Sequence, residues 1–302
     1  MGGGRQEGGR LAAVDLSIII VSYNGRDYLR RCLRSILEHT RELEYEVLVV
    51  DNASRDGSAD MVAAEFSSVH LLRHSRNAGL SKALNEGIRL SSGAIVVLLN
   101  PDVELQDNAF LAMTRYLREH PDVGIMGPRI LDEDGSLQLS CRRFPTFSVV
   151  FFNRYSLLTR LLPRNRLSSR YLMTDFDHGR VTEVDWLSLA CWMAPRRLFD
   201  EVGPLDEGYF LYTEDVDFCQ RVHRAGRKVV YFPEVSLLHH IGGSTSSLPN
   251  RSVVERHRSM WRYYRKYMRR GLMLDAPVAA GIALRCAYTL AFNNAKRVMR
   301  RG

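Results

Sequence analysis

The sequence lacks the signature motifs of several common enzyme classes. No Gly-x-Gly-x-x-Gly follows its first apolar run, and no Walker A motif occurs in its 302 residues. These absences argue against a dinucleotide-dependent dehydrogenase and against a P-loop NTPase. A Gly-x-Ser-x-Gly elbow is also missing, which argues against a hydrolase of the α/β class.

Cysteine pairs and long apolar runs are scarce as well. The five cysteines are scattered without a Cys-x-x-Cys pair, so we expect buried thiols in a reducing compartment rather than a disulfide framework or a zinc site. Two uncharged stretches near the C-terminus, 276–284 and 286–295, are separated by Arg285. Neither reaches the roughly 18–20 residues that a membrane-spanning helix needs.

The first residues carry no targeting signal. Residues 1–10 are glycine-rich and polar and lack the apolar stretch of a signal peptide. Gln6 stands where a myristoylation signal has Ser or Thr. We therefore expect residues 1–15 to form a disordered leader on a cytoplasmic protein.

Charge is distributed unevenly along the chain. With 45% hydrophobic and 25% charged residues, the overall composition is typical of a soluble globular protein. The net charge is +8, yet residues 251–302 hold 13 lysines and arginines against two acidic residues, which leaves −3 on the first 250 residues. Such a basic segment indicates an anionic partner: a membrane surface, a phosphorylated lipid or a nucleic acid.

Short apolar runs alternate with helical periodicity over the first 120 residues. Runs rich in β-branched residues predict strands buried on both faces, at 16–22, 45–50, 69–72 and 94–99. Apolar residues at helical spacing predict helices at 27–39, 58–66, 81–90 and 107–119. The alternation predicts a doubly wound α/β fold with a mainly parallel sheet.

Polar clusters follow three of these predicted strands. Ser22-Tyr-Asn24 follows the first, Asp51-Asn52 the second and Asn100-Pro-Asp102 the fourth. Ligands of doubly wound sheets bind outside the carboxyl ends of the strands. The clusters therefore predict a binding site at that edge of the sheet.

The second half of the chain has a looser pattern. From 124 to 184 no clear period is present, and we expect a mobile loop over 142–170. Further on, strands are predicted at 184–192, at 228–232 with Pro233 ending the run, and at 236–240. Helices are predicted at 196–202 and 213–225, and residues 251–302 read as helical and basic.

Three groups of polar residues are candidates for metal binding or acid–base chemistry, and each also has a structural interpretation. Asp102 either forms a turn or holds a divalent cation. The carboxylates of Glu214, Asp215 and Asp217 either cap a helix or provide a general base. His239 and His240 end a strand and point to opposite faces, so at most one enters a given site, as a structural residue or as a metal ligand.

A glycine-containing turn with basic neighbours is another candidate binding site. Arg73, Arg76 and Lys82 surround Asn77-Ala-Gly79. Gly79 either lets a ligand approach the backbone or supplies a positive φ. The basic side chains either bind an anion or form a solvated surface.

Taken together, these motifs resemble glycosyltransferase family 2, the inverting nucleotide-sugar transferases of GT-A fold, and within it the bacterial rhamnosyltransferase-like branch. The motifs occur in the family's order across residues 16–245. They are Ile20-Val-Ser-Tyr-Asn24, Val49-Val-Asp-Asn-Ala-Ser54, Asp56-Gly57, Asn77-Ala-Gly79, Asn85-Glu-Gly87, Leu99-Asn-Pro-Asp102, Val184-Asp-Trp186, Phe210-Leu-Tyr-Thr-Glu-Asp-Val-Asp217 and His239-His-Ile-Gly-Gly243.

The resemblance implies a role for individual positions. Asp215 matches the general base, and Asp102 matches the metal ligand of the family's Asp-x-Asp motif. His239 matches a second ligand of Mg²⁺ or Mn²⁺, with His240 as the alternative. Trp186 and Glu214 are implied on the acceptor side. The donor-binding residues implied are Ser22, Asn24, Asp51, which would read the nucleobase, Asn52, Arg76, Asn77, Gly79, Lys82, Asn100 and Asp102.

The chain departs from the family's pattern at two positions. Asn100 replaces the first aspartate of Asp-x-Asp, which removes one charge. Leu189 stands where similar sequences usually carry glycine, and its side chain fills space on the acceptor side.

The implied activity is a metal-dependent, inverting transfer of a sugar such as rhamnose. The donor would be a dTDP- or UDP-sugar, and the acceptor a lipid-linked or growing glycan of the cell envelope. The implied catalytic domain covers 16–250, with a nucleotide-sugar half at 16–125, an acceptor half at 126–250 and a helical tail at 251–302. A membrane-bound scaffold and a sugar-1-phosphate nucleotidyltransferase are the alternatives.

The tail itself admits two interpretations. Trp261, Tyr264 and Met268 form an apolar stripe at helical spacing within a basic segment. The stripe either packs on the catalytic domain or lies on an anionic membrane leaflet, at the inner face of the cell membrane. Nucleic acid is disfavoured as a partner, because the body of the chain is acidic and no nucleic-acid module is recognisable.

Overall fold

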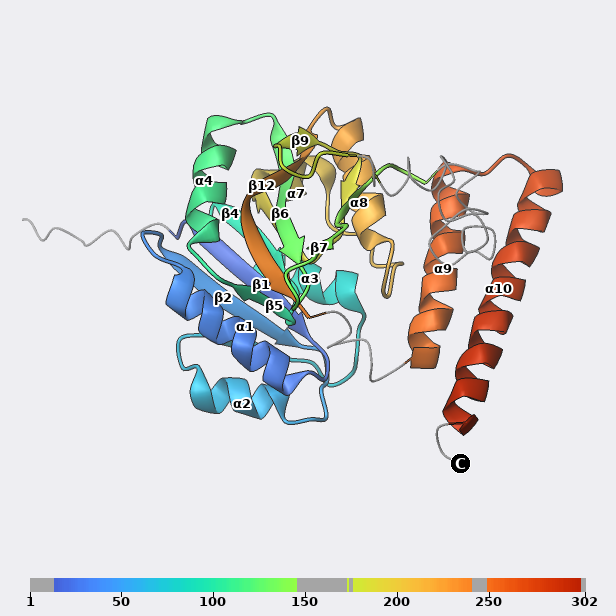
Figure 1. The fold of residues 1–302 in the computed structure, drawn as a ribbon, viewed down its shortest axis with the longest axis horizontal. Coiled ribbons are helices and arrows are strands. Elements are labelled where there is room, and N and C mark those ends of the chain that lie inside the picture. The colour runs from blue at the N-terminus through green and yellow to red at the C-terminus, as the bar shows by residue number, and fades with distance from the viewer. Residues whose placement is uncertain (1–13, 146–172, 174–175, 241–248, 300–302) are drawn as a thin grey trace, which may run out of the picture.

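The computed structural model describes residues 14–145, 173, 176–240 and 249–299. A ten-stranded sheet lies at its centre, in the order β3-β2-β1-β4-β11-β6-β12-β5, with β7 paired to β6 and β9 to β12. Helices cover both faces of the sheet, and two further helices, α9 and α10, stand at one side (Figure 1). The expected α/β fold with a mainly parallel sheet and C-terminal helices is confirmed.

The first half of the sheet is entirely parallel. It consists of β3 (His70–Arg73), β2 (Tyr45–Asp51), β1 (Leu16–Ser22) and β4 (Ile95–Leu99). All residues of β1 and β4 are buried, as expected for strands covered on both faces. The register pairs Ser22 with Asp51, so the carboxyl ends of β1 and β2 lie side by side.

The helices divide between the two faces of the sheet. On one face α1 (Arg26–His39), α2 (Ser58–Glu65) and α4 (Ala109–Glu119) pack through residues such as Leu33 and Phe110. On the other face lie α3 (Leu80–Leu90), α7 (Arg197–Val202) and α8 (Glu214–Arg224). The packing matches the apolar faces that the sequence predicts for these segments.

Antiparallel strands enter the second half of the sheet. β11 (Cys191–Pro195) runs antiparallel between β4 and β6 (Val123–Leu131). β12 (Lys228–His239) is parallel to β6, and β5 (Val103–Leu105) pairs antiparallel with β12. Four strands are only two residues long: β7 (Leu137–Gln138), β8 (Cys141–Arg142), β9 (Thr182–Glu183) and β10 (Trp186–Leu187); β8 and β10 form a separate two-stranded sheet.

The strand predicted at 184–192 is wrong as a single element. β10 pairs with β8, whereas β11 joins the central sheet. Between them the chain turns at 188–190, where the N–H of Ala190 donates to the carbonyl of Ser188 at 2.8 Å. The apolar run is continuous in the sequence, but the two strands belong to different sheets.

Two other strand predictions also need correction. Pro233 does not end a strand, because β12 continues through it with a register shift between Phe232 and Ser236. A bulge of this kind accommodates a residue that cannot donate to the ladder. β6 lies within the region where the sequence shows no clear period, and Gly124, Gly127 and Pro128 interrupt its apolar pattern.

The predicted leader lies almost entirely outside the described residues, as does most of the predicted loop at 142–170.

The basic tail forms a pair of helices, α9 (Pro249–Tyr267) and α10 (Leu272–Met299). They run side by side in opposite directions, and the amide of Asn250 donates to Asn294 at 2.9 Å (Figure 1). The stripe of Trp261, Tyr264 and Met268 packs against α10, so these residues hold the pair together. Within the described residues, no helix has both the length and the apolar content needed to span a membrane.

α9 is tied to the sheet domain by a buried ionic cluster. The carboxylate of Asp217, on α8, is fully buried and lies 2.7 Å from the Lys266 ammonium. It accepts a hydrogen bond from the Tyr267 hydroxyl at 2.9 Å and one from Nε of Arg221 at 3.1 Å. At Asp206, burial opposes ionisation, but hydrogen bonds from Arg262 and Lys266 outweigh it and lower the pKa of this carboxyl to about 2.

We expect Asp217→Ala to lower the free energy of unfolding by about 3 kcal/mol, because removing one partner leaves buried charges without compensation. Chemical denaturation measures the loss. Asp60→Ala is the matched control, since Asp60 pairs with Arg73 on the surface with 81% of its side chain exposed and should change stability little. Equal losses in the two variants would contradict the structural role given to Asp217.

Candidate active site

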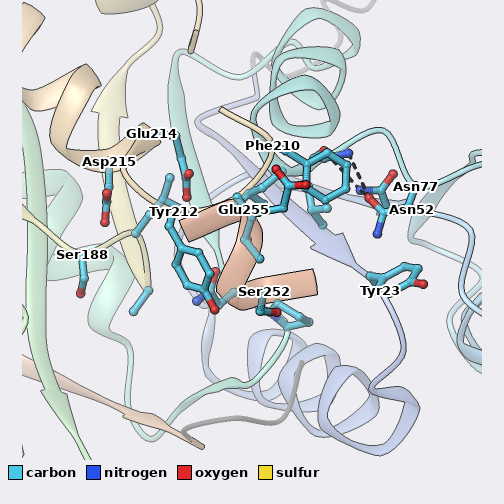
Figure 2. A pocket seen from close by; sticks show the side chains of 18 of the residues that line it. Tyr23, Asn52, Asn77, Ser188, Phe210, Tyr212, Glu214, Asp215, Ser252 and Glu255 are labelled. Atoms are coloured by element: carbon cyan, nitrogen blue, oxygen red, sulfur yellow. Dashed lines mark hydrogen bonds between the residues drawn. The ribbon is translucent and has the colours of Figure 1, made fainter. Parts of the chain in front are cut away.

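A pocket of about 300 Å³ opens at the carboxyl ends of β1 and β4. Its walls come from the turn at 188–190, the loop at 210–213, the start of α8 and the first turns of α9. In Figure 2, Ser188, Glu214 and Asp215 lie at one end, and Tyr23, Asn52 and Asn77 lie at the other. Tyr212, Ser252 and Glu255 lie between the two ends.

Asn52 organises the turn that forms one end of the pocket. Its amide nitrogen donates to the side chain of Asn77 at 3.1 Å and to the carbonyl of Gly79 at 3.2 Å. Its oxygen accepts the N–H of Ala78 at 2.8 Å and lies 3.0 Å from Nδ1 of His74. The turn at 77–79 is therefore held rigidly against the end of β2.

Gly79 has φ of +91°, and a Cβ there would lie 2.9 Å from the carbonyl oxygen of Phe210. The N–H of Leu80 donates to that same carbonyl at 2.8 Å. Both properties of glycine are therefore used at this position: the positive φ and the close approach of a second backbone segment.

Asp51 ends β2 with a buried carboxylate that is only partly satisfied. Its Oδ2 accepts the N–H of Ser54 at 3.0 Å, while Oδ1 has no hydrogen-bond partner among the described residues. The hydroxyl of Ser22, its neighbour in register, likewise lacks a partner within the described part of the chain. A buried acceptor of this kind is costly unless a ligand donates to it. The side chain of Asn24 instead accepts the N–H of Arg55 at 2.8 Å and joins two loops.

The structure distinguishes the two histidines at the end of β12. Nε2 of His239 lies 3.3 Å from the carboxylate of Asp102, and His239 lines the pocket. His240 points to the other face, where Nε2 lies 2.7 Å from Glu104 and Nδ1 contacts Glu133. Of the two, only His239 faces Asp102.

Asp102 and His239 fit a site with two protein ligands. A carboxylate oxygen and an imidazole nitrogen are suitable donors for Mg²⁺ or Mn²⁺, and Mg²⁺ commonly keeps its remaining positions for water and substrate phosphates. The described residues contain no group of three or more His, Cys, Asp or Glu placed to hold a metal. The pair therefore suits a cation completed by a phosphorylated ligand better than a closed structural site.

Glu214 and Asp215 form the first turn of α8. Burial raises the pKa of Asp215 to about 6, although its Oδ1 accepts the N–H of Val216 at 2.8 Å. Burial and the neighbouring charge of Asp215 raise the pKa of Glu214 well above its ordinary value. Two carboxyl groups so close titrate as a pair. One of them is set to exchange a proton near neutral pH.

The loop before α8 is strained and is held by α9. Tyr212 and Thr213 have φ of +68° and +70°, which is unfavourable for residues with a side chain. The guanidinium of Arg256 lies 4.5 Å from the ring centre of Tyr212, and that of Arg251 lies 4.4 Å from the ring of Phe210. The hydroxyl of Ser259 also donates to the carbonyl of Leu211 at 2.9 Å.

Residues from α9 are the main addition to the predicted site. Arg251, Ser252 and Glu255 line the pocket, yet they lie beyond 250, where the expected catalytic domain ends. Their types carry no motif. Only the packing of α9 on the loop at 210–213 brings them to the site.

The lining of this pocket omits eight of the predicted residues. Six of them are chain neighbours of lining residues: Ser22, Asn24, Asp51, Arg76, which is exposed, Asp102 and His240. The other two lie away from it. Lys82 lines a separate hollow with Glu207. Trp186 is buried and donates from its indole to the carbonyl of Arg143 at 2.9 Å. Leu189, where a departure from the family was noted, lines the pocket within the turn at 188–190.

Comparison with known proteins agrees with this architecture. The family model described as "Glycosyl transferase family 2" matches residues 17–176. The N-acetylglucosaminyl-diphospho-decaprenol L-rhamnosyltransferase of Mycobacterium tuberculosis is 32% identical over 257 residues, which cover 82% of both chains.

Two solved structures share the fold. GalNAc-T7, crystallised with UDP, GalNAc and Mn²⁺, aligns with a TM-score of 0.58 at 17% identity and covers 85% of this chain; the chain spans 50% of its length. The mannosyltransferase PcManGT of Pyrobaculum calidifontis, in complex with GDP-Man and Mn²⁺, aligns with a TM-score of 0.55 at 18% identity, over 93% of this chain and 73% of its own.

The close approach at Gly79 can be measured against a second glycine. Gly135 also has a positive φ, +80°, but a Cβ there would meet nothing within 4 Å. We expect Gly135→Ala to cost about 1 kcal/mol from backbone strain alone. Gly79→Ala should cost more, because its Cβ must displace the loop at Phe210. Denaturation curves of both variants measure the difference, and similar costs would rule out a tight contact at Gly79.

Proposed function

The chain belongs to glycosyltransferase family 2 and is a glycosyltransferase, and on that premise we propose that it transfers a rhamnosyl group, with inversion, from dTDP-rhamnose to a lipid-linked glycan acceptor. One observation carries the proposal. Asn100, His239 and Asp215 come from separate parts of the chain, and all three line one pocket. Asp102 lies beside His239 at that edge of the sheet.

Donor binding follows from the groups at the ends of β1 and β2. Oδ1 of Asp51, which no described residue bonds, is suited to accept the imide N–H of thymine or uracil, which supports a dTDP- or UDP-sugar. Ser22, Asn52, the turn at 77–79 and Asn100 complete the donor side in this proposal. Arg76 and Lys82 stay predictions, because each would have to move to reach a nucleotide in this pocket.

We propose that Asp102 and His239 hold a divalent cation, Mg²⁺ or Mn²⁺, together with the donor diphosphate. Both fold relatives are described with Mn²⁺, and the donor set here fits such an ion. When bound, the cation would neutralise the charge that develops on the leaving diphosphate. Asn100 carries no charge, so it would contribute hydrogen bonds to the donor.

Asp215 is the proposed general base. Its carboxylate takes the proton of the acceptor hydroxyl as that oxygen attacks the anomeric carbon, and the bond to the diphosphate breaks on the opposite face. One displacement of this kind inverts the anomeric configuration. Burial and the charge of Asp215 raise the pKa of Glu214, which favours its protonated form, and in that form it would donate a hydrogen bond to the acceptor. Trp186 would act on the acceptor side only indirectly, from the core.

The acceptor assignment rests on the mycobacterial relative, whose name specifies a diphospho-decaprenol substrate. A lipid-linked acceptor would place the protein peripherally at the inner face of the cell membrane, in cell-envelope polysaccharide synthesis. The catalytic domain is proposed to cover 16–250, with α9 adding one wall of its pocket.

Thermal denaturation with a panel of nucleotide sugars tests the donor. We expect dTDP-rhamnose with Mg²⁺ or Mn²⁺ to stabilise the protein by about 2.7 kcal/mol at a hundred times its dissociation constant. Without the metal, or in Asp51→Asn, the shift should shrink. Asp60→Asn, at the surface, should behave like the wild type. Stabilisation by GDP-mannose alone would contradict the donor assignment, and no response to any nucleotide sugar would contradict the function.

The base assignment predicts a specific pH dependence. The rate of transfer should fall as the pH drops through about 6, because protonated Asp215 cannot accept the acceptor proton. Asp215→Asn should reduce kcat by about 10²–10⁴-fold while the donor still binds. Glu214→Gln should change the rate of transfer far less, and that rate should still fall as the pH drops through the acidic range. Full transfer activity in Asp215→Asn would eliminate this residue as the base.

A further inference from the structure

The outward face of α10 is apolar and has no partner in the described structure. We define this face as the exposed residues of α10 between Ala276 and Ala295, apart from Asn294, which accepts a hydrogen bond from Asn250. None of them is charged, and the large ones are Leu284, Tyr288 and Phe292, which are 72%, 65% and 56% exposed. Their spacing of four residues places them in one row along the helix.

This face is unusual for a water-soluble surface. Single exposed apolar residues are common, but a row of large ones over several turns without a charge marks an interaction site. The opposite side of α10 is already used, because Val278 and Ile282 pack against α9. α10 stands at the edge of the molecule, with α9 between it and the sheet domain (Figure 1).

The charges around the outward face identify the kind of partner. Arg269 and Arg270 are exposed just before α10, where Arg269 pairs with Asp275 at 3.2 Å, and the sequence places Lys296 and Arg297 near the end of the helix. An apolar row with basic residues at both ends fits a helix that lies in the plane of an anionic lipid surface. A second copy of this chain fits poorly. Two such faces in contact would bring basic ends together whether the helices ran parallel or antiparallel.

We propose that the outward face of α10 docks the protein on an anionic membrane. This surface differs from the stripe of Trp261, Tyr264 and Met268, which packs between the two helices with Tyr264 buried and the other two partly buried. The insertion is shallow, since no described helix is long and apolar enough to cross a bilayer. The proposal rests on the proposed function, because a lipid-linked acceptor gives the docking its purpose.

The position of the face relative to the pocket supports this arrangement. Asn250, at the start of α9, is hydrogen-bonded to Asn294, half a turn from Phe292. Arg251, Ser252 and Glu255, which follow Asn250, line the pocket. The helix that contributes this wall of the pocket is therefore bonded directly to the proposed docking helix, which links the site to the lipid surface where a membrane-anchored acceptor would lie.

Vesicle co-sedimentation of the full chain tests the proposal. The probes are vesicles of phosphatidylcholine alone and of phosphatidylcholine mixed equally with phosphatidylglycerol. We expect the wild type to bind the anionic vesicles, less tightly as salt is added, and the neutral ones weakly. The triple variant Leu284→Glu/Tyr288→Glu/Phe292→Glu should bind the anionic vesicles at least about tenfold more weakly than the wild type.

Matched variants separate docking from folding. Leu284→Ala/Tyr288→Ala/Phe292→Ala keeps helix propensity and adds no charge, and it should also lose binding. Leu37→Glu/Leu90→Glu alters exposed leucines on α1 and α3, outside the proposed docking surface, and should bind like the wild type. Wild-type levels of binding in both α10 variants would overturn the proposal, as would a wild type that ignores anionic vesicles. A wild-type dimer whose mass halves in the alanine variant would assign the face to a second copy and overturn it too.

Transfer to a water-soluble acceptor keeps the two proposals distinguishable. The α10 variants should retain this activity, because their substitutions lie outside the pocket, while losing activity on acceptor embedded in vesicles. Vesicle binding without any sugar transfer would refute the proposed function and leave the docking surface standing. Transfer in solution without vesicle binding would refute the docking surface and leave the proposed function standing.

Discussion

The buried carboxylate of Asp217 is the interaction on which the site depends. A charge in the interior is tolerated only when it is fully compensated, and the compensation here comes from two helices. Arg221 belongs to α8, whereas Lys266 and Tyr267 belong to α9. Satisfying this one group therefore fixes α9 against the domain that carries Glu214 and Asp215, the latter the proposed general base. The wall of the pocket and the support of the loop at 210–213 follow from that attachment.

The loop before α8 and the start of that helix adopt a state that costs free energy in the folded protein. Tyr212 and Thr213 adopt strained backbone angles directly before Glu214 and Asp215. Because the pKa of Asp215 is raised in the folded state, its protonated form is the one the fold favours. Its contribution to stability is fully present below the ordinary pKa of an aspartate and is lost as the pH rises through about 6. At neutral pH the ionised carboxylate is thus destabilising, and contacts from Arg251, Arg256 and Ser259 help to offset the cost. Strain and a perturbed carboxyl in one place are typical of a reactive site.

Much of the first half of the fold could be read from the sequence, because its strands are buried on both faces and its helices are amphipathic. The predicted strand at 16–22 matches β1 residue for residue. Prediction failed where the bounds of a strand depend on which other strands it pairs with rather than on its own periodicity. The run at 184–192 divides between two sheets, β12 passes through Pro233 by a bulge, and β6 is interrupted by glycine and proline. A residue's pairing partner depends on strands far away in the chain, and local patterns do not encode it.

The sequence by itself determined the family, the order of the motifs and the placement of polar groups at the carboxyl ends of the strands. It also established that His239 and His240 must point to opposite faces, because side chains alternate along a strand. Only the tertiary structure decided which of them meets Asp102, because that depends on how β12 sits beside β5 and β6. Tertiary structure likewise decided how the tail is used. α9 forms part of the pocket, and its apolar stripe packs against α10. The apolar residues left exposed on α10 are those that no described part of the chain covers.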